Sequence, residues 1–221
     1  MIRFENVTKF FPIRGGYRRI IEHLNLDIPR GRSVGLLGRN GAGKSTVLKM
    51  IAGTLDPDEG RIIRQARISW PLGFAGGFHP NLTGAQNVRF VARIYGVDTD
   101  ALLAYVEDFA ELGKFLYEPV ITYSSGMRAR LAFGVSMGVA FDFYLVDEVT
   151  AVGDEDFRRK CQAVFTQRLT KSDVIMVSHS MNMLRQYCTG GIVLEHGKAI
   201  YYEDLEEAID LHMANMTGQN G

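Results

Sequence analysis

A glycine-rich segment, residues 38–45, has the residue types and spacing needed to hold a chain of phosphates. Gly38, Gly43, Lys44 and Ser45 occupy every fixed position of the pattern G-x-x-x-x-G-K-[ST]. Glycines let backbone N–H groups curl around an anion, and a helix that follows them adds its positive N-terminus. Lys44 would reach the β- and γ-phosphates, and the Ser45 hydroxyl would ligate Mg²⁺. We interpret the segment as a nucleoside triphosphate site; the alternative is a tight glycine turn that carries a lysine.

Two carboxylates follow the continuous apolar run at residues 143–146. Such a run is typical of a buried parallel strand whose carboxyl end faces a ligand. Asp147 is suited to hold Mg²⁺, and Glu148 can polarise an attacking water. His179 follows a second strand pattern, residues 173–178, so it can contact the γ-phosphate or that water. The alternative for His179 is a polar residue with only a structural hydrogen bond.

A serine pair and a glycine precede a helical pattern at residues 128–135. Ser124, Ser125 and Gly126 would begin this helix and offer a second N-terminus that can receive phosphate. The alternative is a simple N-cap.

Two segments combine aromatic side chains with turn residues. We expect residues 10–19 to form a turn-rich connection, from which an exposed aromatic can stack on an adenine. Residues 70–84 predict a flexible loop with hydrophobic contacts to make. Ordinary packing of the aromatics is the alternative in both segments.

The patterns between these motifs predict the elements that must position them. Strand patterns occupy residues 2–7, 24–28, 33–37 and 61–69, and a hairpin pattern occupies 192–201. Helical patterns occupy residues 46–52, 86–95, 100–112 and 205–213. The order strand, glycine loop, helix is the one that a phosphate-binding loop requires, and the middle helices indicate an insertion in an α/β core.

The composition is that of an ordinary soluble globular protein of 221 residues, with 46% hydrophobic and 23% charged residues. Lys+Arg and Asp+Glu balance at 25 each, so no global field recruits nucleic acid or anionic lipid. No apolar stretch approaches the roughly 20 residues of a membrane span, and the polar N-terminus differs from a secretory signal. Cys161 and Cys188 lack metal-ligand spacing. We expect a protein that stays in the cytoplasm with two free thiols.

Together these motifs resemble those of the ATP-binding subunits of ABC transporters, over nearly the whole chain. Residues 38–45 resemble Walker A, with Thr46 as the usual following hydroxyl, and residues 144–148 resemble Walker B plus the catalytic glutamate. Residues 123–127 resemble the signature motif, residues 151–154 the D-loop, and His179 the switch histidine. The resemblance implies an α/β fold in one domain, residues 1–221: a P-loop NTPase core with a parallel sheet, an N-terminal antiparallel β-layer, and a helical subdomain at residues 84–140.

The same resemblance implies ATP and Mg²⁺ as ligands. Lys44, Glu148 and His179 would be catalytic, and Ser45 and Asp147 would hold Mg²⁺. The aromatic residue that stacks on adenine falls best on Phe11, with Tyr17 as a competitor. The full set expected to contact nucleotide is Phe11, Tyr17, Gly38, Asn40, Gly41, Ala42, Gly43, Lys44, Ser45, Thr46, Ser124, Ser125, Gly126 and Asp154.

One departure and several longer strings narrow the resemblance. The glutamine of the Q-loop is missing from its region, residues 72–78, so its role falls to another group. Residues 70–74, 82–88 and 147–154 look like those of bacterial exporters of cell-surface polysaccharide, nearest to the capsular polysaccharide export subunits. O-antigen and teichoic acid exporters share several of these features but often carry a further C-terminal domain, for which we expect no room in a chain that ends at residue 221.

The resemblance also implies partners. Two copies would associate head to tail around two ATP, so that Ser124 and Gly126 act on the nucleotide of the second copy. A separate membrane permease would hold the pair at the cytoplasmic face of the bacterial inner membrane, through residues 74–78 and the helical insertion. Periplasmic and outer-membrane export components would be reached indirectly, and nucleic acid is not an expected partner.

Three alternatives stay open at this stage. The same ATPase could drive another cargo, such as O-antigen, teichoic acid or a drug. A GTPase switch would need the guanine motif Asn-Lys-x-Asp, whose nearest match, residues 170–173, lacks the asparagine. A nucleotide-gated scaffold would bind ATP without needing to hydrolyse it.

Overall fold

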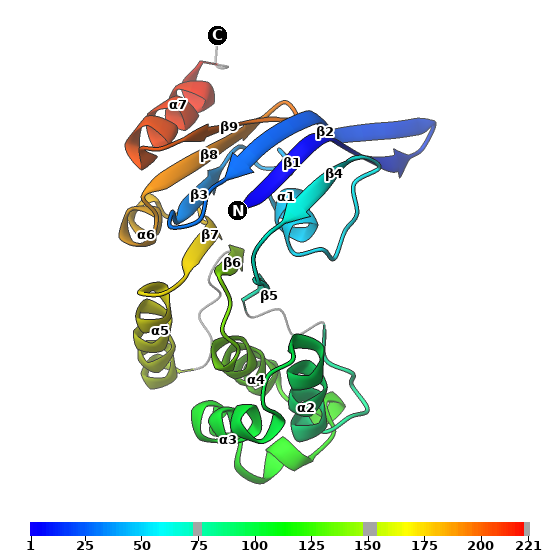
Figure 1. Ribbon diagram of the computed structural model, residues 1–221, viewed down its shortest axis with the longest axis vertical. Coiled ribbons are helices and arrows are strands. Elements are labelled where there is room, and N and C mark those ends of the chain that lie inside the picture. Colours follow the sequence, from blue (N-terminus) through cyan, green and yellow to red (C-terminus); the bar gives the residue numbers. More distant parts are fainter. Residues whose placement is uncertain (73–76, 148–153, 219–221) are drawn as a thin grey trace. The chain divides into compact units, whose positions relative to one another are not determined.

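The computed structural model describes residues 1–72, 77–147 and 154–218. These residues form two compact units, and each is described by itself below. The first unit comprises residues 1–71, 141–147 and 172–218 and holds every strand that the structure describes (Figure 1). The second unit comprises the described parts of 72–140 and 149–171 and is helical. Each unit is therefore assembled from segments that are separated in the sequence.

The N-terminal β-layer is a sheet of β1 (Ile2–Ile13), β2 (Gly16–Ile28) and β4 (Glu59–Arg64), in the order β2-β1-β4. Both pairings of β1 are antiparallel, which confirms the predicted layer. The expected turn-rich connection at residues 10–19 is wrong, because β1 and β2 stay paired out to Ile13 and Gly16. The glycines and the proline favoured an irregular segment. In the structure Pro12 lies in β1 near the tip of the hairpin, where Tyr17 of β2 pairs with it.

The core sheet has the order β5-β6-β7-β3-β8-β9, and only β8 and β9 pair antiparallel. The expected strands before the glycine-rich segment and before the two acids lie in its interior, and both are buried because helices or the other sheet cover their faces. These fold features confirm the predicted α/β class. The strands are β3 (Val34–Leu37), β5 (Ile68–Pro71), β6 (Phe143–Asp147), β7 (Asp173–Val177), β8 (Gly190–Glu195) and β9 (Lys198–Tyr202).

Helix α1 (Lys44–Ile51) links the two sheets of the first unit. Its buried residues, such as Leu48 and Ile51, share one hydrophobic core with residues of β1, β2, β3, β6 and β8. On the opposite side of β3, Leu184 of α6 (Met181–Tyr187) and Leu205 of α7 (Leu205–Thr217) pack against Gly35. Packing on both faces holds β3, and hence the loop that leaves it, in one position.

The helical unit packs around the ring of Phe109, which lies 5.9 Å from that of Phe133 and 5.5 Å from that of Phe157. These rings come from α3 (Thr99–Ala110), α4 (Ser125–Gly138) and α5 (Glu155–Leu169). Helix α2 (Gly84–Tyr95) and two short 3-10 helices, Gly113–Tyr117 and Val120–Thr122, complete the unit. The unit therefore presents the N-terminus of α4 on a packed framework.

The segment before α2 is held by one buried amide, that of Asn87. Its Oδ1 accepts from the backbone of His79 at 2.8 Å, and its Nδ2 donates to the carbonyls of His79, Leu82 and Thr83. Thr83 and Gln86 form a reciprocal capping box at the start of α2. The described end of the aromatic loop is thus ordered by local polar contacts; its residues 73–76 lie outside the described ranges.

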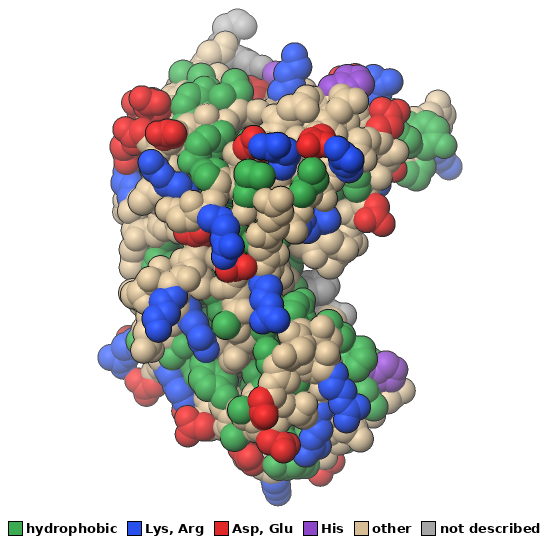
Figure 2. Space-filling view, in the orientation of Figure 1, with side chains coloured by type: hydrophobic (Ala, Val, Ile, Leu, Met, Phe, Trp, Pro, Cys, Tyr) green, Lys and Arg blue, Asp and Glu red, His purple; other side chains and the backbone are tan. Residues whose placement is uncertain are grey.

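The surface carries both signs of charge, interspersed over the face in Figure 2. This distribution agrees with the equal numbers of acidic and basic residues. Across the part of the chain that the structure describes, none of the helices has the length and apolar character needed to cross a bilayer.

Candidate functional site

The phosphate-binding loop, residues 38–43, joins β3 to α1 and has the backbone that its glycines permit. Gly38, Gly41 and Gly43 have φ of 156°, 81° and 105°. A Cβ on Gly38 would lie 2.4 Å from the Leu194 carbonyl oxygen, and one on Gly43 would lie 2.6 Å from Cγ2 of Ile20. A side chain at either position would thus fill the cradle or displace its walls. The loop fits the phosphate group for which its sequence pattern was interpreted.

Helix α1 begins without a side-chain cap, whereas every other α-helix in the described ranges has one. Its N-cap is Gly43, so no side-chain oxygen takes the first N–H groups of the helix. An anion is the partner that such N–H groups and the helix dipole favour. The glycine N-cap is therefore compatible with a phosphate at the start of α1.

Lys44 curls back over the loop. Its Nζ donates to the carbonyl oxygens of Gly38 at 2.6 Å and Arg39 at 3.1 Å. These bonds hold the ammonium beside the backbone that would enclose the phosphates. The Ser45 hydroxyl is exposed and Thr46 is half-buried, both in the first turn of α1.

The carboxyl ends of β6, β7 and β3 lie side by side, because these strands are parallel neighbours in the sheet. Asp147 is the last residue of β6, half-buried and paired with Val177 of β7. His179 follows β7 and is exposed, and the phosphate-binding loop follows β3. The structure thus brings Asp147, His179 and Lys44 to one edge of the sheet. Glu148 lies outside the described residues.

The described residues contain no cluster of three or more His, Cys, Asp or Glu side chains that could enclose a metal ion. Mg²⁺ seldom needs such a cage, because it binds one or two protein oxygens and keeps waters and substrate phosphates as its other ligands. The Ser45 hydroxyl and the Asp147 carboxylate are hard oxygen donors of this kind. The residues present therefore fit Mg²⁺ bound together with a nucleotide.

The register of the β1–β2 hairpin separates the two aromatic candidates. Phe11 pairs with Arg18, so the two share a face of the hairpin, and Arg18 lines a cavity of about 280 Å³ with Asn40, Gly41 and Ala42 of the phosphate-binding loop. Tyr17 pairs with Pro12 on the other face. Arg19, on the face of Tyr17, also lines this cavity, so the register places the two aromatic residues on opposite faces without deciding which one a nucleotide on the loop would meet.

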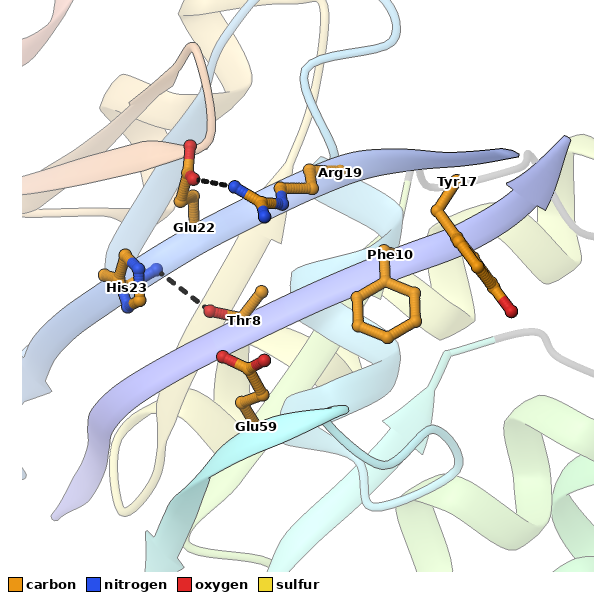
Figure 3. Close-up of a pocket in the computed structure, with 7 residues that line it drawn as sticks. All are labelled: Thr8, Phe10, Tyr17, Arg19, Glu22, His23 and Glu59. Atoms are coloured by element: carbon orange, nitrogen blue, oxygen red, sulfur yellow. Dashed lines mark hydrogen bonds and ion pairs between the residues drawn. The ribbon is translucent and has the colours of Figure 1, made fainter. Parts of the chain in front are cut away.

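Tyr17 lines a different cavity, of about 260 Å³, on the outer face of the antiparallel sheet. Its ring meets that of Phe10 edge-on, with centroids 5.1 Å apart. Figure 3 shows these two rings at one end of the cavity and the polar side chains of Thr8, Arg19, Glu22, His23 and Glu59 along the rest of it. Tyr17 therefore has a packing partner that explains its position.

Sequence patterns gave no signal for His212 of α7. Burial of its imidazole and the nearby Lys44 ammonium lower the pKa of His212, and the Glu195 carboxylate opposes this shift. Asn215, one turn along α7, donates a hydrogen bond to Glu195. The packing of α7 against β8 and β3 brings His212 within electrostatic reach of Lys44.

In the helical unit, Ser124 is the N-cap of α4. Its Oγ accepts from the backbone of Met127 at 3.2 Å, and Ser124 and Ser125 are exposed. The preceding Tyr123 is buried, and its hydroxyl donates to the Phe115 carbonyl at 2.5 Å. A Cβ on Gly126 would meet only the Ser124 Oγ, at 3.9 Å. The buried Tyr123 thus holds the residue before α4 in place, while Ser124, Ser125 and Gly126 have open space around them.

Asp154 already has partners for its carboxylate within the helical unit. One oxygen accepts from the backbone of Phe157 at 2.9 Å and so caps α5, and the other pairs with Arg130 at 2.8 Å. These contacts lower the pKa of the Asp154 carboxyl, with the Phe157 bond as the largest cause. The neighbouring residues 151–153 of the expected D-loop lie outside the described ranges.

Comparisons with known proteins agree with this geometry. The sequence pattern of the ABC transporter family matches residues 21–151. The polysialic acid transport ATP-binding protein KpsT of Escherichia coli is 50% identical over 213 residues, which cover 95% of each chain. The capsule polysaccharide export ATP-binding protein CtrD of Neisseria meningitidis serogroup B is 46% identical, over 96% of this chain and 98% of its own.

Two further likenesses are more distant. The O-antigen export system ATP-binding protein RfbB of Klebsiella pneumoniae is 33% identical over 98% of each chain. The ATP-binding cassette MJ0796, solved as a dimer in a post-hydrolysis state with ADP and phosphate, has the same fold, with a TM-score of 0.74 and 22% identity over 93% of this chain and 99% of its own. The family match at residues 21–151 covers more than half of the chain and includes the phosphate-binding loop, and the likenesses to KpsT and CtrD cover 95% and 96% of it. The chain therefore belongs to the ABC transporter family, as one of its ATPases.

Proposed function

We propose that the chain is the ATP-hydrolysing subunit of an exporter of capsular polysaccharide, working through a separate membrane permease. The observation that carries this proposal is the full-length likeness to the polysialic acid and capsule export subunits. The uncapped, glycine-lined start of α1 supports the ATPase part of the proposal, because it suits a triphosphate.

The residues at the sheet edge divide the chemistry among them. Lys44 and the N–H groups of the phosphate-binding loop stabilise the negative charge that builds up during phosphoryl transfer. Ser45 and Asp147 would hold Mg²⁺, which when bound neutralises charge on the β- and γ-phosphates. Glu148 orients or deprotonates the attacking water, and His179 supports the γ-phosphate side. Phe11 stacks on the adenine from the face of the hairpin that it shares with Arg18, which lines the cavity beside the loop.

A second copy of the chain completes each site in this proposal. Ser124, Ser125 and Gly126 would approach the γ-phosphate bound to the other copy, so ATP would favour the closed pair through its higher affinity for that state. The open space around Gly126 and the exposed tip of α4 support this role. Hydrolysis would remove the bridging phosphate and release the pair.

The permease would bind the pair at the cytoplasmic face of the inner membrane, and export components of the periplasm and outer membrane would be engaged only through it. Residues 74–78 and the helical insertion are the proposed contact with the permease. Phe78 is among the described residues of this loop, whereas residues 73–76 are not.

Glu148→Gln tests the ATPase assignment. The change removes the base but keeps the shape of the side chain, so we expect ATP binding to persist, turnover to fall by orders of magnitude, and an ATP-bound dimer to accumulate. Phosphate release, nucleotide binding and size-exclusion chromatography measure the three. Glu107→Gln, the same change on the exposed side of α3, serves as the control and retains turnover. Wild-type turnover in Glu148→Gln would refute the role of Glu148 as base.

The second candidate for the cargo is O-antigen or teichoic acid. It is supported by the 33% identity to an O-antigen export subunit. Complementation separates the two. We expect the chain, supplied with its own permease, to restore surface polysaccharide to a strain that lacks its capsule export ATPase, but not O-antigen to a strain that lacks the corresponding subunit. Restoration of O-antigen alone would make the second candidate the function.

A further inference from the structure

The β1–β2 hairpin reaches beyond the third strand of its sheet. Pairing between β1 and β4 ends at Thr8 and Glu59, whereas pairing between β1 and β2 continues to Ile13 and Gly16 (Figure 1). From Phe10 onward, β1 has lost its partner on the β4 side within the described sheet. Phe11 therefore sits on a projecting ribbon whose direction must be set near its base.

Asp58, in the turn just before β4, holds that base with three contacts. Its backbone N–H donates to the Thr8 carbonyl at 2.9 Å. Its Oδ2 accepts from the backbone N–H of Phe10 at 2.7 Å, and its Oδ1 accepts from Nζ of Lys9 at 3.0 Å. The carboxylate thus takes over at the point where the strand pairing of β4 stops. The carboxylate accepts from the N–H of Phe10, which lies beyond the last residue of β1 that pairs with β4.

The same carboxylate controls the surroundings of Phe11. The Lys9 side chain is only 11% exposed, and its ammonium lies 5.5 Å from the centre of the Phe11 ring. Partial burial raises the pKa of the Asp58 carboxyl, but the bonds from Phe10 and Lys9 outweigh this effect, and the pKa lies below its ordinary value. The Asp58 carboxylate bonds to Phe10, the residue before Phe11, and to Lys9, whose ammonium lies over the Phe11 ring. It therefore restrains Phe11 through both neighbours.

We propose that Asp58 is a positioning residue for nucleotide binding: it orients Phe11 toward the phosphate-binding loop and thereby sets the affinity for the adenine base. This inference rests on the proposed stacking of Phe11 on adenine. Asp58 acts through Phe10 and Lys9, so it changes the recognition of the base and leaves the recognition of the phosphates unchanged.

The test compares two ligands on the full chain. Asp58→Asn keeps the size of the side chain but replaces the charged acceptor and turns amide protons toward the Lys9 ammonium. We expect ATP to bind about fivefold more weakly and inorganic tripolyphosphate, which has no base, to bind as it does to the unmutated chain. Asp27→Asn is the matched control, because it removes the ion pair with Arg3 in the same sheet, far from Phe11, and we expect it to leave both affinities unchanged. Equal weakening toward both ligands would overturn the proposal, since it would mean general damage to the loop.

A double-variant cycle completes the test and separates this inference from the function on which it rests. If Asp58 acts through Phe11, Asp58→Asn adds little to the loss of ATP affinity already caused by Phe11→Ala. Full additivity, with Phe11→Ala effective by itself, would overturn the role of Asp58 and leave the stacking assignment standing. Unchanged ATP affinity in Phe11→Ala would overturn both.

Discussion

Two glycines, Gly43 in the phosphate-binding loop and Gly126 at the start of α4, occupy motifs of the same family but stand in opposite situations. Gly43 has a φ of 105°, and a Cβ on it would lie 2.6 Å from Cγ2 of Ile20. Gly126 lies in a helix, and a Cβ on it would meet nothing closer than 3.9 Å. The fold of the chain requires the first glycine, whereas nothing within the described helical unit requires the second.

The contrast extends to the helices that these glycines begin. The start of α1 lacks a side-chain cap, while Ser124 caps α4 within its own chain. The α/β unit thus has a helix start without a side-chain cap and a shaped cradle, which suit it to bind a nucleotide. The helical unit offers an exposed tip that is already capped, and Gly126 leaves room there for a group from outside the chain to approach closely.

Lys44→Ala addresses the α/β side of this comparison and has the largest expected effect. Removal of the ammonium that bonds to Gly38 and Arg39 should lower ATP turnover by about a hundredfold or more, as loss of a charge-stabilising donor does. Phosphate release measures it. Lys49→Ala, on the exposed side of α1, should retain turnover. A Lys44→Ala chain with more than a tenth of normal turnover would contradict the assigned role.

Gly43→Ala tests whether the fold demands this glycine. The strained backbone and the contact with Ile20 should lower the free energy of unfolding by about 1–3 kcal/mol and weaken ATP binding. Denaturant unfolding and nucleotide titration measure the two. An unchanged unfolding midpoint would show that the loop adapts to a side chain at position 43. The claim that the fold requires Gly43 but not Gly126 would then be wrong.

Gly126→Ala tests the second half. Because the added methyl group finds open space in a helix, the free energy of unfolding should change by less than about 1 kcal/mol. Binding of ATP to the monomer should stay the same, and turnover should fall by about tenfold, since the methyl group would hinder the second copy. A large loss of stability would mean that Gly126 is needed within its own chain.

Ser124→Ala separates capping from function. Loss of the bond to Met127 should lower the free energy of unfolding by about 1 kcal/mol. Thr83→Ala, which removes the cap of α2 in the same unit, should cost a similar amount but leave turnover near normal. Turnover that falls equally in the two variants would indicate that Ser124 serves only as a cap.

Glu111→Gln has the smallest expected effect and depends on pH. The hydrogen bond from Lys160, at 2.6 Å, is the largest cause that lowers the pKa of Glu111 below its ordinary 4.5. The ion pair therefore stabilises the helical unit above pH 4.5, and this contribution is lost as the pH falls through the lowered value. At 54% exposure it should be worth at most about 0.5 kcal/mol. Unfolding of both chains at pH 7 and pH 3 should show a larger difference at pH 7 than at pH 3.

The sequence anticipated the elements whose signals are local. The strand, glycine loop and helix at residues 33–52 could be predicted from the residue types and their spacing alone. The buried run before Asp147 and the N-cap at Ser124 are likewise determined by neighbouring residues. Helix α5 escaped the prediction because its buried residues, Phe157, Cys161 and Phe165, form a stripe only one residue wide. Their regular spacing of four was the signal that could have found it.

Other features depended on partners that the sequence pattern does not show. The run at residues 61–69 was interpreted as one alternating segment, but the chain divides it between β4 of the antiparallel sheet and β5 of the core sheet. The hairpin at residues 10–19 likewise formed because each strand could pair with the other, against a local preference for turns. Pairing across a sheet outweighs local propensity in such segments.

By itself, the sequence determined the family, the phosphate-binding loop and the identity of the residues that could act on a triphosphate, because these depend on residue type and short spacing. Tertiary structure alone decided which residues share a site. Strand order set Asp147 and His179 beside the loop, hairpin register put Phe11 and Tyr17 on opposite faces, and Asp58 came to bond the base of that hairpin from the turn before β4. The physical reason is that register and strand order arise from contacts between residues distant in sequence, and no local pattern records them.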